Sequence, residues 1–583
     1  MSRHRHSSHA QPSEHSNGGP EEAGEATLAQ PHHPHSHPHS GHHHASVSPD
    51  HFDLAQAALD EMHAAGFHPE FGPDVDEQVN AIQADLAQQN TQAKPGSLPD
   101  LRNLIWSSID NDTSRDLDQI EVAERVPAGI RLHVAIGDVT GAVTKDSPID
   151  KHAHAQTQTI YTAVRQFPML PFELSTGATS LNENADRTAV MMSFTVAIDG
   201  QMSDEQISCA WVQNRAQLAY SRVGPWLDNT VQNTEKTLGN PEKIRALRSD
   251  SARDAEQFGQ AAFGAGMDER AFGEALAEQL RMQDEAAYAL RKVREQNGAL
   301  EFHRAEAEPV VVDGRIASVH DVLQNRAMYL IEDLMVAANG VMARALRRGG
   351  RSGLQRVVRV PRRWDRIVAL AAQHDWELPA NPDSLALNQF LKHQRATDSD
   401  HYPDIAVATI KLMGPGEYML MRPNDDPTGH FGLAARDYTH STAPNRRFPD
   451  IVTQRILHAM IDNAPPPYTD DELTAIAAHC NEADSALRKI ERNMQKRVAA
   501  VAMAHRIGEI FRGVITGVSD KGVYVRVIEP PFEGRVIQNP DGLDVGDRVS
   551  VKLLHTDPAR AFIDFARVPN GQNNSSTHHE PSR

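Results

Sequence analysis

The chain has 583 residues, of which 39% are hydrophobic and 23% charged, and its formal net charge is −20. This length suggests roughly three to five structural units. Two cysteines exclude a disulfide scaffold and a thiolate zinc cluster. The two cysteines fit a reducing cytosol, and the chain has no apolar run of 18 or more residues that could span a membrane, so we expect a cytoplasmic protein. Read alone, the acidic balance argues against a nucleic-acid partner, because phosphates repel acidic surfaces.

The first 97 residues have two different compositions. Residues 1–50 hold 12 of the 31 histidines and almost no large apolar residues, which predicts a disordered tail that could bind a metal only loosely. Residues 51–97 predict a small helical module. Apolar residues between Phe52 and Met62 recur at helical spacing, "AGFHPEFGPD" breaks the run, and a second helix surrounds Ile82.

Residues 98–462 are expected to form one domain of strands and helices. Residues 235–297 have a helical period and are rich in Ala, Glu, Gln and Arg. Apolar alternation predicts strands in four segments, at 130–139, 188–198, Val310–Val312 and Ile405–Met421.

The C-terminal part combines long helices with a dense strand pattern. Residues 451–461 and 470–501 predict helices, the second within a helical connector at 463–505. Residues 506–567 alternate between apolar and polar residues, with glycines between short strands, which predicts a small β-barrel. Residues 568–583 predict a disordered polar tail.

The most informative segment contains four aspartates within nine residues: Asp110, Asp112, Asp116 and Asp118. Carboxylate oxygens are hard ligands that suit Mg²⁺ or Mn²⁺. Asp116 and Asp118 are two residues apart, so an extended backbone points both the same way. Two cations held about 4 Å apart would stabilise the attacking and leaving oxygens of phosphodiester hydrolysis. From spacing alone, a solvated acidic turn is an equal alternative.

This segment resembles the aspartate signature of the ribonuclease II/R (RNB) family, whose pattern is I-D-x₅-D-x-D-D. Further blocks follow in the family's order, among them "HVAIGDV" (133–139), "FPMLPFELS" (167–175), "HFGL" (430–433) and "YTHSTAPNRRFPD" (438–450). The resemblance implies an α+β protein: an RNB catalytic domain with a mixed sheet and surrounding helices at about 98–462, followed by an OB-fold barrel. The family's tandem N-terminal cold-shock barrels are not recognisable, so the chain is similar to a shorter branch of the family. Phe511 and Tyr524 lie where OB folds usually stack bases.

The resemblance implies a set of site residues. Asp110, Asp116 and Asp118 match three of the four metal-binding and catalytic aspartates, but the fourth position is Gln119, a neutral amide that gives less charge to a cation. Arg446 matches the family's active-site arginine, which would clamp the scissile phosphate. Asp112 or Asp138 could help at the metal site.

Four further residues match substrate contacts of the family. Tyr161 and Phe302 match the aromatics that sandwich the terminal bases, and Tyr220 matches an aromatic that lines the channel. Glu332 matches a residue that reads the ribose 2′-OH. Taken alone, each aromatic would more often be a core residue, and Glu332 would be read as solvent-facing.

Basic charge gathers at Arg344–Arg366, which holds nine arginines and one acidic residue, Asp365. Forked guanidinium donors suit phosphate. We expect this run to contact RNA, and the alternative is a solvated helix face and loop.

The function that the resemblance implies is a hydrolytic 3′→5′ exoribonuclease. It would degrade single-stranded RNA processively to 5′-nucleoside monophosphates with Mg²⁺, or Mn²⁺ in its place, as a monomer without an organic cofactor. The runner-up is a non-catalytic or weakened RNA-binding protein on the same fold, which Gln119 supports. A third hypothesis, an interaction protein that uses the His-rich tail, has no specific support beyond the tail.

Overall fold

The computed structural model describes residues 52–89, 98–232, 246–249, 268–302, 305–312, 315–398, 401–520, 522–530 and 532–569. The tail predicted at 1–50, nearly all of that at 568–583 and part of the helical segment at 235–297 lie outside these ranges. Every helix within the described ranges is too short or too polar to cross a lipid bilayer.

Two helices open the described chain, α1 (Leu54–Ala64) and α2 (Pro73–Gln89), as predicted. The side chain of Asp53 caps α1 by accepting a 2.9 Å hydrogen bond from the backbone N–H of Gln56. One face of α1 packs against α13 (Asp470–Met503), in an apolar cluster shared with the segment that contains Phe167. The first helix of the module is therefore packed along the long helix, whereas Val75 and Val79 of α2 belong to the main apolar cluster of the domain.

The centre of the domain is a closed barrel of five strands, in the order β1-β2-β3-β6-β7. Strand β7 pairs in parallel with β1, and the other pairs are antiparallel, so the sheet is mixed. The strands predicted at 130–139 and 188–198 are confirmed as β3 and β6. Bounds are β1 (Trp106–Asp110), β2 (Gln119–Val126), β3 (Gly129–Gly137), β6 (Asp186–Val196) and β7 (Met202–Ala219).

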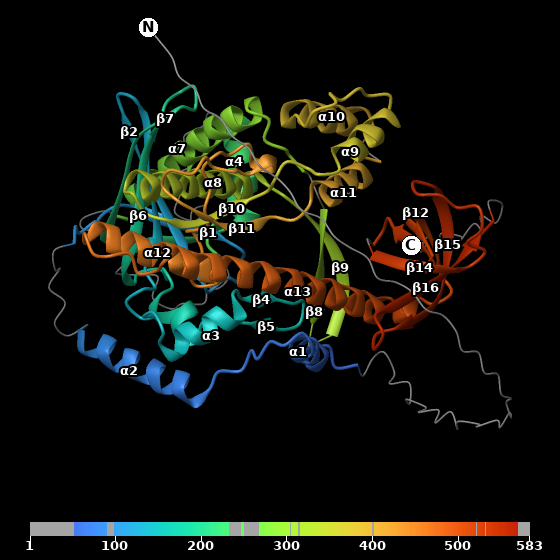
Figure 1. Cartoon of the computed structure of the whole chain (residues 1–583), viewed down its shortest axis with the longest axis horizontal. Helices are drawn as coiled ribbons and strands as arrows, with labels where there is room; N and C mark the ends of the chain where they lie inside the picture. The colour runs from blue at the N-terminus through green and yellow to red at the C-terminus, as the bar shows by residue number, and fades with distance from the viewer. Residues whose placement is uncertain are drawn as a thin grey trace, which may run out of the picture. The chain divides into compact units, whose positions relative to one another are not determined.

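The two faces of these strands contact different apolar clusters, because side chains alternate along a strand. Ile120 and Val122 pack with Trp106 in one cluster, whereas Ala123 packs with Ile109 in the other. Helices lie around the barrel (Figure 1): α3 (Pro148–Gln156), α4 (Tyr220–Gln232), α7 (Glu269–Gln296), α8 (Arg326–Arg348) and α12 (Phe448–Ile461).

Smaller elements complete the domain. Three two-stranded sheets form from β4 (Ile160–Tyr161) and β5 (Gln166–Phe167), β8 (Ala305–Val312) and β9 (Arg315–Leu323), and β10 (Gly353–Val357) and β11 (Glu417–Met421). The remaining helices are α9 (Trp364–Ala372), α10 (Ser384–Thr397) and α11 (Tyr402–Met413).

The prediction of a strand over Ile405–Met421 is wrong for its first part. Residues 402–413 form α11, and only 417–421 form a strand. Tyr402, Ile405, Ala406 and Thr409 are buried at helical spacing, and Pro403 occupies the first turn, where a missing N–H costs nothing. Helical burial and a helix start therefore outweigh the β-branched residues of this segment.

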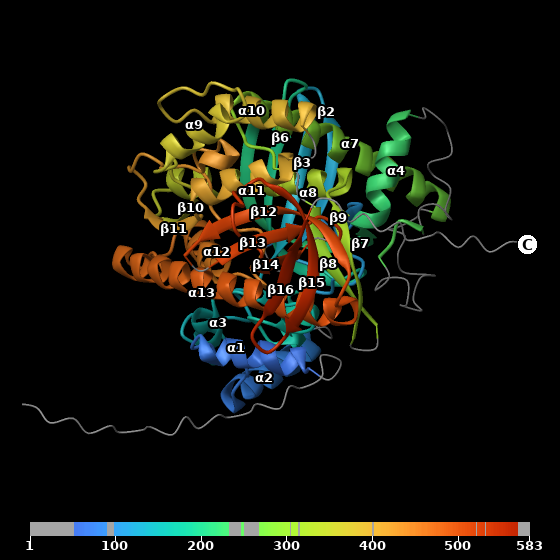
Figure 2. The same ribbon diagram turned by 90° about the vertical axis from the view of Figure 1, so that its right-hand side faces the viewer.

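The C-terminal segment forms a second closed barrel, in the order β12-β13-β14-β16-β15, which confirms the predicted OB-type barrel (Figure 2). Its strands are β12 (Ile510–Ser519), β13 (Gly522–Val527), β14 (Phe532–Gln538), β15 (Arg548–Asp557) and β16 (Phe562–Val568). The base-stacking role expected for Phe511 is wrong, because its ring is 4% exposed and lies 5.9 Å from the ring of Phe532 in the barrel core. Tyr524 is half-buried on β13.

A buried ion pair joins α12 to α3. Arg455 donates to Asp150 Oδ1 at 2.7 Å, to the carbonyl of Val143 at 2.6 Å and to the hydroxyl of Tyr468 at 2.7 Å. Both charged side chains are 7% exposed. This network fixes the helix that begins just after Arg446.

Candidate active site

The aspartate signature spans the end of one barrel strand and the start of the next. Asp110 is the last residue of β1, and Gln119 is the first residue of β2. The Gln119 amide donates a 3.1 Å hydrogen bond to Oδ1 of Asp110. Gln119, which stands where the family signature has an aspartate, therefore lies in the site and contacts Asp110, a predicted metal ligand.

Asp118 is held from the other side by the loop before α12. Its Oδ1 accepts from the backbone N–H of Asn445 at 3.0 Å, and its Oδ2 accepts from Nε of Arg446 at 3.0 Å. Asp118 is 1% exposed, whereas the side chain of Arg446 is 44% exposed. Arg446 thus anchors its Nε on Asp118 and keeps guanidinium surface accessible.

Asp116 contacts an aromatic residue of β4. The hydroxyl of Tyr161 donates to Asp116 Oδ2 at 2.5 Å, and the tyrosine is 47% exposed. The ring of Tyr161 is therefore presented to solvent beside the carboxylate cluster.

The three predicted ligands influence one another electrostatically. Burial raises the pKa of Asp110 to about 7, and repulsion from Asp118 and Asp116 adds to the shift. Burial also raises the pKa of Asp118 to about 6, although the positive charge of Arg446 opposes this. Repulsion between buried carboxylates favours a bound cation at this site.

Tyr220 follows Ala219, which pairs with Asp110 across β7 and β1. Burial raises the pKa of the Tyr220 phenol, and the charges of Asp110 and Glu121 raise it further. The amide of Asn325, at the start of α8, donates a 3.0 Å hydrogen bond to the carbonyl of Tyr220. This close approach requires a glycine, because a Cβ on Gly224 would lie 2.6 Å from Asn325. Tyr220 is placed beside the aspartates.

The structure does not bring Phe302 into this group. Phe302 packs against a separate apolar cluster that contains Trp364 and Phe390, and no ring contact joins it to Tyr161 in the described part of the chain. Glu332 is exposed on α8, next to Asp333, which is buried and paired with Arg291 at 2.6 Å.

Asp112 and Asp138, considered as helpers at the metal site, are engaged elsewhere. Asp112 pairs with Arg222 at 3.0 Å and accepts from the hydroxyl of Ser221 at 2.6 Å. Asp138 accepts from Thr140 at 2.7 Å and lies 2.9 Å from His458.

Most of the arginine run contacts the protein itself, which argues against the expected phosphate contacts for those residues. Arg344 and Arg348 both pair with Glu205, and Arg351 donates to two backbone carbonyls. Three more arginines pair with single carboxylates: Arg347 with Asp437, Arg356 with Asp484, and Arg359 with Glu417. Among the described residues, Arg362, Arg363 and Arg366 have no such pair.

The side chains that could hold a cation are the signature carboxylates. As they lie, no three His, Cys, Asp or Glu side chains of the described ranges converge closely enough to hold a metal ion. Asp110, Asp116 and Asp118 are each turned towards a donor, namely Gln119, Tyr161 and Arg446. Oδ2 of Asp110 is nevertheless buried without a hydrogen-bond partner among these residues. An unpartnered, buried carboxylate oxygen fits a hard cation.

Sequence reasoning missed two contributors. The backbone N–H of Asn445 holds Asp118, and no side-chain pattern signals a backbone donor. Glu121 is fully buried near Asp110. The sequence did carry a signal for it, because this carboxylate stands between the apolar residues Ile120 and Val122.

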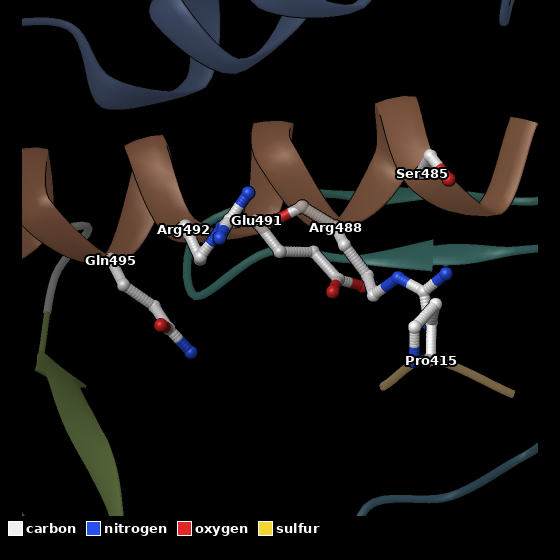
Figure 3. A pocket seen from close by; sticks show the side chains of 6 residues that line it. All are labelled: Pro415, Ser485, Arg488, Glu491, Arg492 and Gln495. Carbon is white, nitrogen blue, oxygen red and sulfur yellow. Dashed lines mark hydrogen bonds between the residues drawn. The ribbon is translucent and has the colours of Figure 1, made fainter. Parts of the chain in front are cut away.

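A separate hollow of about 420 Å³ lies along α13 and is lined by Pro415, Ser485, Arg488, Glu491, Arg492 and Gln495. Figure 3 shows Arg488 and Glu491 next to each other on the helix, with Pro415 facing them. The hollow contains none of the residues predicted from the sequence, so we place no chemistry there.

The ion pair between His458 and Asp138 gives a prediction on pH. The short contact with Asp138 is the main reason that the pKa of His458 rises to about 10. Because the unfolded pKa is about 6.5, the stabilisation is complete below that pH and is lost as the pH rises through about 10. His458→Gln should therefore lower the thermal unfolding midpoint more at about pH 6 than at about pH 10. An equal loss at both values, measured at one ionic strength, would contradict the ion-pair explanation.

Comparisons with known proteins place this geometry in a family. Residues 99–463 match the RNB domain model, and residues 509–568 match that of the RNase II-type exonuclease C-terminal S1 domain. Ribonuclease R 1 of Lactococcus lactis is 25% identical over 532 residues, which cover 86% of this chain and 59% of that protein. The chain thus spans about three-fifths of that relative's length.

Solved structures share the fold. Mycoplasma genitalium RNase R in complex with ribose-methylated single-stranded RNA aligns with a TM-score of 0.73 at 22% identity, covering 88% of this chain and 78% of that one. Yeast Ssd1, described as a pseudonuclease, aligns with a TM-score of 0.57 at 14% identity, covering 87% of this chain and 58% of that one. Since the family model spans more than half of the sequence and includes the aspartate site, the chain belongs to the RNB domain family.

Proposed function

We propose that this protein is a hydrolytic exoribonuclease that degrades single-stranded RNA from its 3′ end, processively, to 5′-nucleoside monophosphates. The observation that carries the proposal is the cluster of Asp110, Asp116 and Asp118 around Arg446, within the segment that matches the RNB domain. RNB relatives are named ribonucleases, and one of them was solved with single-stranded RNA.

Asp110, Asp116 and Asp118 are the proposed ligands of Mg²⁺, or of Mn²⁺ in its place. When bound, the metal would polarise the phosphate and favour ionisation of the attacking water. Asp118 also orients Arg446, because it holds Nε and leaves the rest of the guanidinium accessible. The accessible N–H groups can donate to a phosphate and offset the charge that develops as the bond breaks.

The proposed RNA contacts extend outwards from this centre. The exposed ring of Tyr161 can stack on a base, and the exposed carboxylate of Glu332 can accept a hydrogen bond from a ribose 2′-OH. Tyr220 would support the end of the RNA strand beside Asp110. The packing of Phe302 does not support a base contact in this conformation.

The proposed division of labour follows the predicted domains. Residues 98–462 would cut RNA, residues 506–567 would bind it, and the helices at 51–97 and 463–505 would hold these parts together. We propose that the protein acts as a monomer in the cytoplasm.

The test uses the full chain and one single-stranded RNA, labelled at either end, with Mg²⁺ or Mn²⁺. We expect immediate release of a labelled mononucleotide from the 3′ end. The 5′ label should pass from full length to a short product without intermediate lengths. Cleavage from the 5′ end, or internal cleavage, would overturn the proposal.

The second candidate is a non-catalytic RNA-binding protein. Gln119 favours it, because an amide bonded to Asp110 replaces a carboxylate of the family signature. Tight RNA binding without cleavage under any divalent metal would support this candidate. Gln119→Asp would then show whether the lost charge is responsible, because activity should appear in that variant.

Tyr161 gives a prediction with a matched pair of variants. Tyr161→Ala removes the exposed ring and should weaken RNA binding by about 1–3 kcal/mol, the value of one stacked base. Tyr161→Phe removes only the hydroxyl bonded to Asp116 and should retain this affinity. Fluorescence anisotropy with a short labelled RNA measures both. Equal losses in the two variants would assign the effect to the hydroxyl.

A further inference from the structure

Glu121 is a buried carboxylate with no counter-charge among the residues that the structure describes. Its side chain is completely buried, and neither Oε1 nor Oε2 has a hydrogen-bond partner in the described part of the chain. It lies on β2 opposite Ser107 of β1, whose hydroxyl is buried and also unpartnered there. Two polar side chains that face each other across a strand pair are thus left without partners.

The face of β2 that carries Glu121 also carries Gln119, which contacts the aspartate site. Gln119 and Glu121 are two residues apart, so their side chains point to the same side of the strand. Gln119 donates a hydrogen bond to Asp110, whereas Ile120 and Val122 contact the opposite apolar cluster. The negative charge of Asp110 contributes to raising the pKa of Glu121. The charges of both carboxylates contribute to raising the pKa of the Tyr220 phenol.

Other buried acids in the described ranges are paired with arginine. Glu183 pairs with Arg248, and Asp150 pairs with Arg455. Removing a carboxylate from water without such compensation is expensive. The Ser107 hydroxyl opposite Glu121 and Oδ2 of Asp110, whose charge acts on Glu121, are buried oxygens that also have no hydrogen-bond partner among the described residues. Hard oxygen atoms without a donor are a ligand set for a divalent cation.

We propose that Glu121 is a cation ligand of the active site, acting with the unpartnered oxygen of Asp110, and that it supplies the carboxylate missing at position 119. Its role in hydrolysis rests on the proposed function. The carboxylate is displaced by two residues along the same face of one strand, and the longer glutamate side chain partly bridges that displacement.

Mn²⁺ binding to the full chain without RNA tests this directly, by calorimetry and by the Mn²⁺-dependent rise of the unfolding midpoint. Glu121→Gln keeps the shape of the side chain and should weaken Mn²⁺ binding by at least about tenfold or remove one bound ion. Glu124→Gln is the matched control on the same strand, because the Glu124 side chain is exposed and lies 3.3 Å from His133. It should bind Mn²⁺ like the wild type.

A double variant tests whether position 121 replaces position 119. Gln119→Asp combined with Glu121→Gln moves the carboxylate back to position 119 and should restore most of the Mn²⁺ affinity. Glu121→Leu checks a purely structural role. If the residue only fills space, this variant should keep the full Mn²⁺-dependent rise of the midpoint, and that result would overturn the proposal.

The two proposals can fail separately. If the wild type degrades RNA but Glu121→Gln binds Mn²⁺ as tightly as the wild type, Glu121 is not a ligand and the exoribonuclease stands. If Mn²⁺ binding depends on Glu121 but no RNA is cleaved, the ligand stands and the exoribonuclease fails.

Discussion

Asp118→Asn should reduce the rate of RNA hydrolysis by at least about 10²–10³-fold, the loss typical when one electrostatic contact of a transition state is removed. The asparagine has nearly the same shape, but it removes the charge that would hold the cation and that positions Arg446 through its Nε. RNA binding should persist, because the proposed RNA contacts of Tyr161 and of the C-terminal barrel do not use Asp118. Single-turnover cleavage of a labelled RNA and a binding titration measure the two effects separately.

Asp112→Asn is the control for this variant. Asp112 belongs to the same loop, but its carboxylate pairs with Arg222 instead of facing the cluster. It should retain far more activity than Asp118→Asn. Equal losses would mean that any aspartate of the loop supports the reaction, which would contradict the assignment of Asp118.

Arg455→Met should destabilise the protein by about 3–5 kcal/mol, the cost of leaving one partner of a buried ion pair uncompensated. The variant leaves the buried carboxylate of Asp150 without its positive partner. It also removes the hydrogen-bond donors to the carbonyl of Val143 and the hydroxyl of Tyr468. Urea unfolding followed by tryptophan fluorescence measures the loss. Because α12 begins two residues after Arg446, activity should fall before the protein unfolds completely.

Two variants control for the change in side chain. Arg125→Met removes two exposed ion pairs, with Glu278 and Glu285, and each such pair contributes only about 0–1 kcal/mol. Arg455→Met combined with Asp150→Leu removes both buried charges and should recover much of the lost stability. If stability is not recovered, the loss in Arg455→Met comes mainly from lost packing and not from the uncompensated charge of Asp150.

The sequence predicted the parts of the fold in which local pattern and burial agree. Strands β3 and β6, the two N-terminal helices and the C-terminal barrel follow directly from periodicity. The signature also predicted that Asp110, Asp118 and Arg446 would meet, although 328 residues separate the last two. That convergence is a property of the family pattern, because no local rule joins residues so distant in the chain.

The errors arise where the partner of a side chain decides its role. Phe511 has the residue type and the strand position of a stacking platform, yet its ring points into the barrel core. Arg344 and Arg348 lie in a basic run that suggests phosphate contacts. Both instead form ion pairs with Glu205, which is far from them in the sequence. The sequence pattern did not single out Glu121 either, because only the structure shows that its buried carboxylate has no hydrogen-bond partner among the described residues.

Helix α13 has a consequence for how this protein can be divided. Ala500 and Met503, at its C-terminal end, belong to the hydrophobic core of the second barrel, and Arg497 donates both to Glu61 of α1 and to the carbonyl of Pro558 in that barrel. A barrel fragment that begins at 506 would expose part of its own core to water. A fragment for solution studies must carry the last turns of this helix. These turns both end α13 and complete the hydrophobic core of the second barrel.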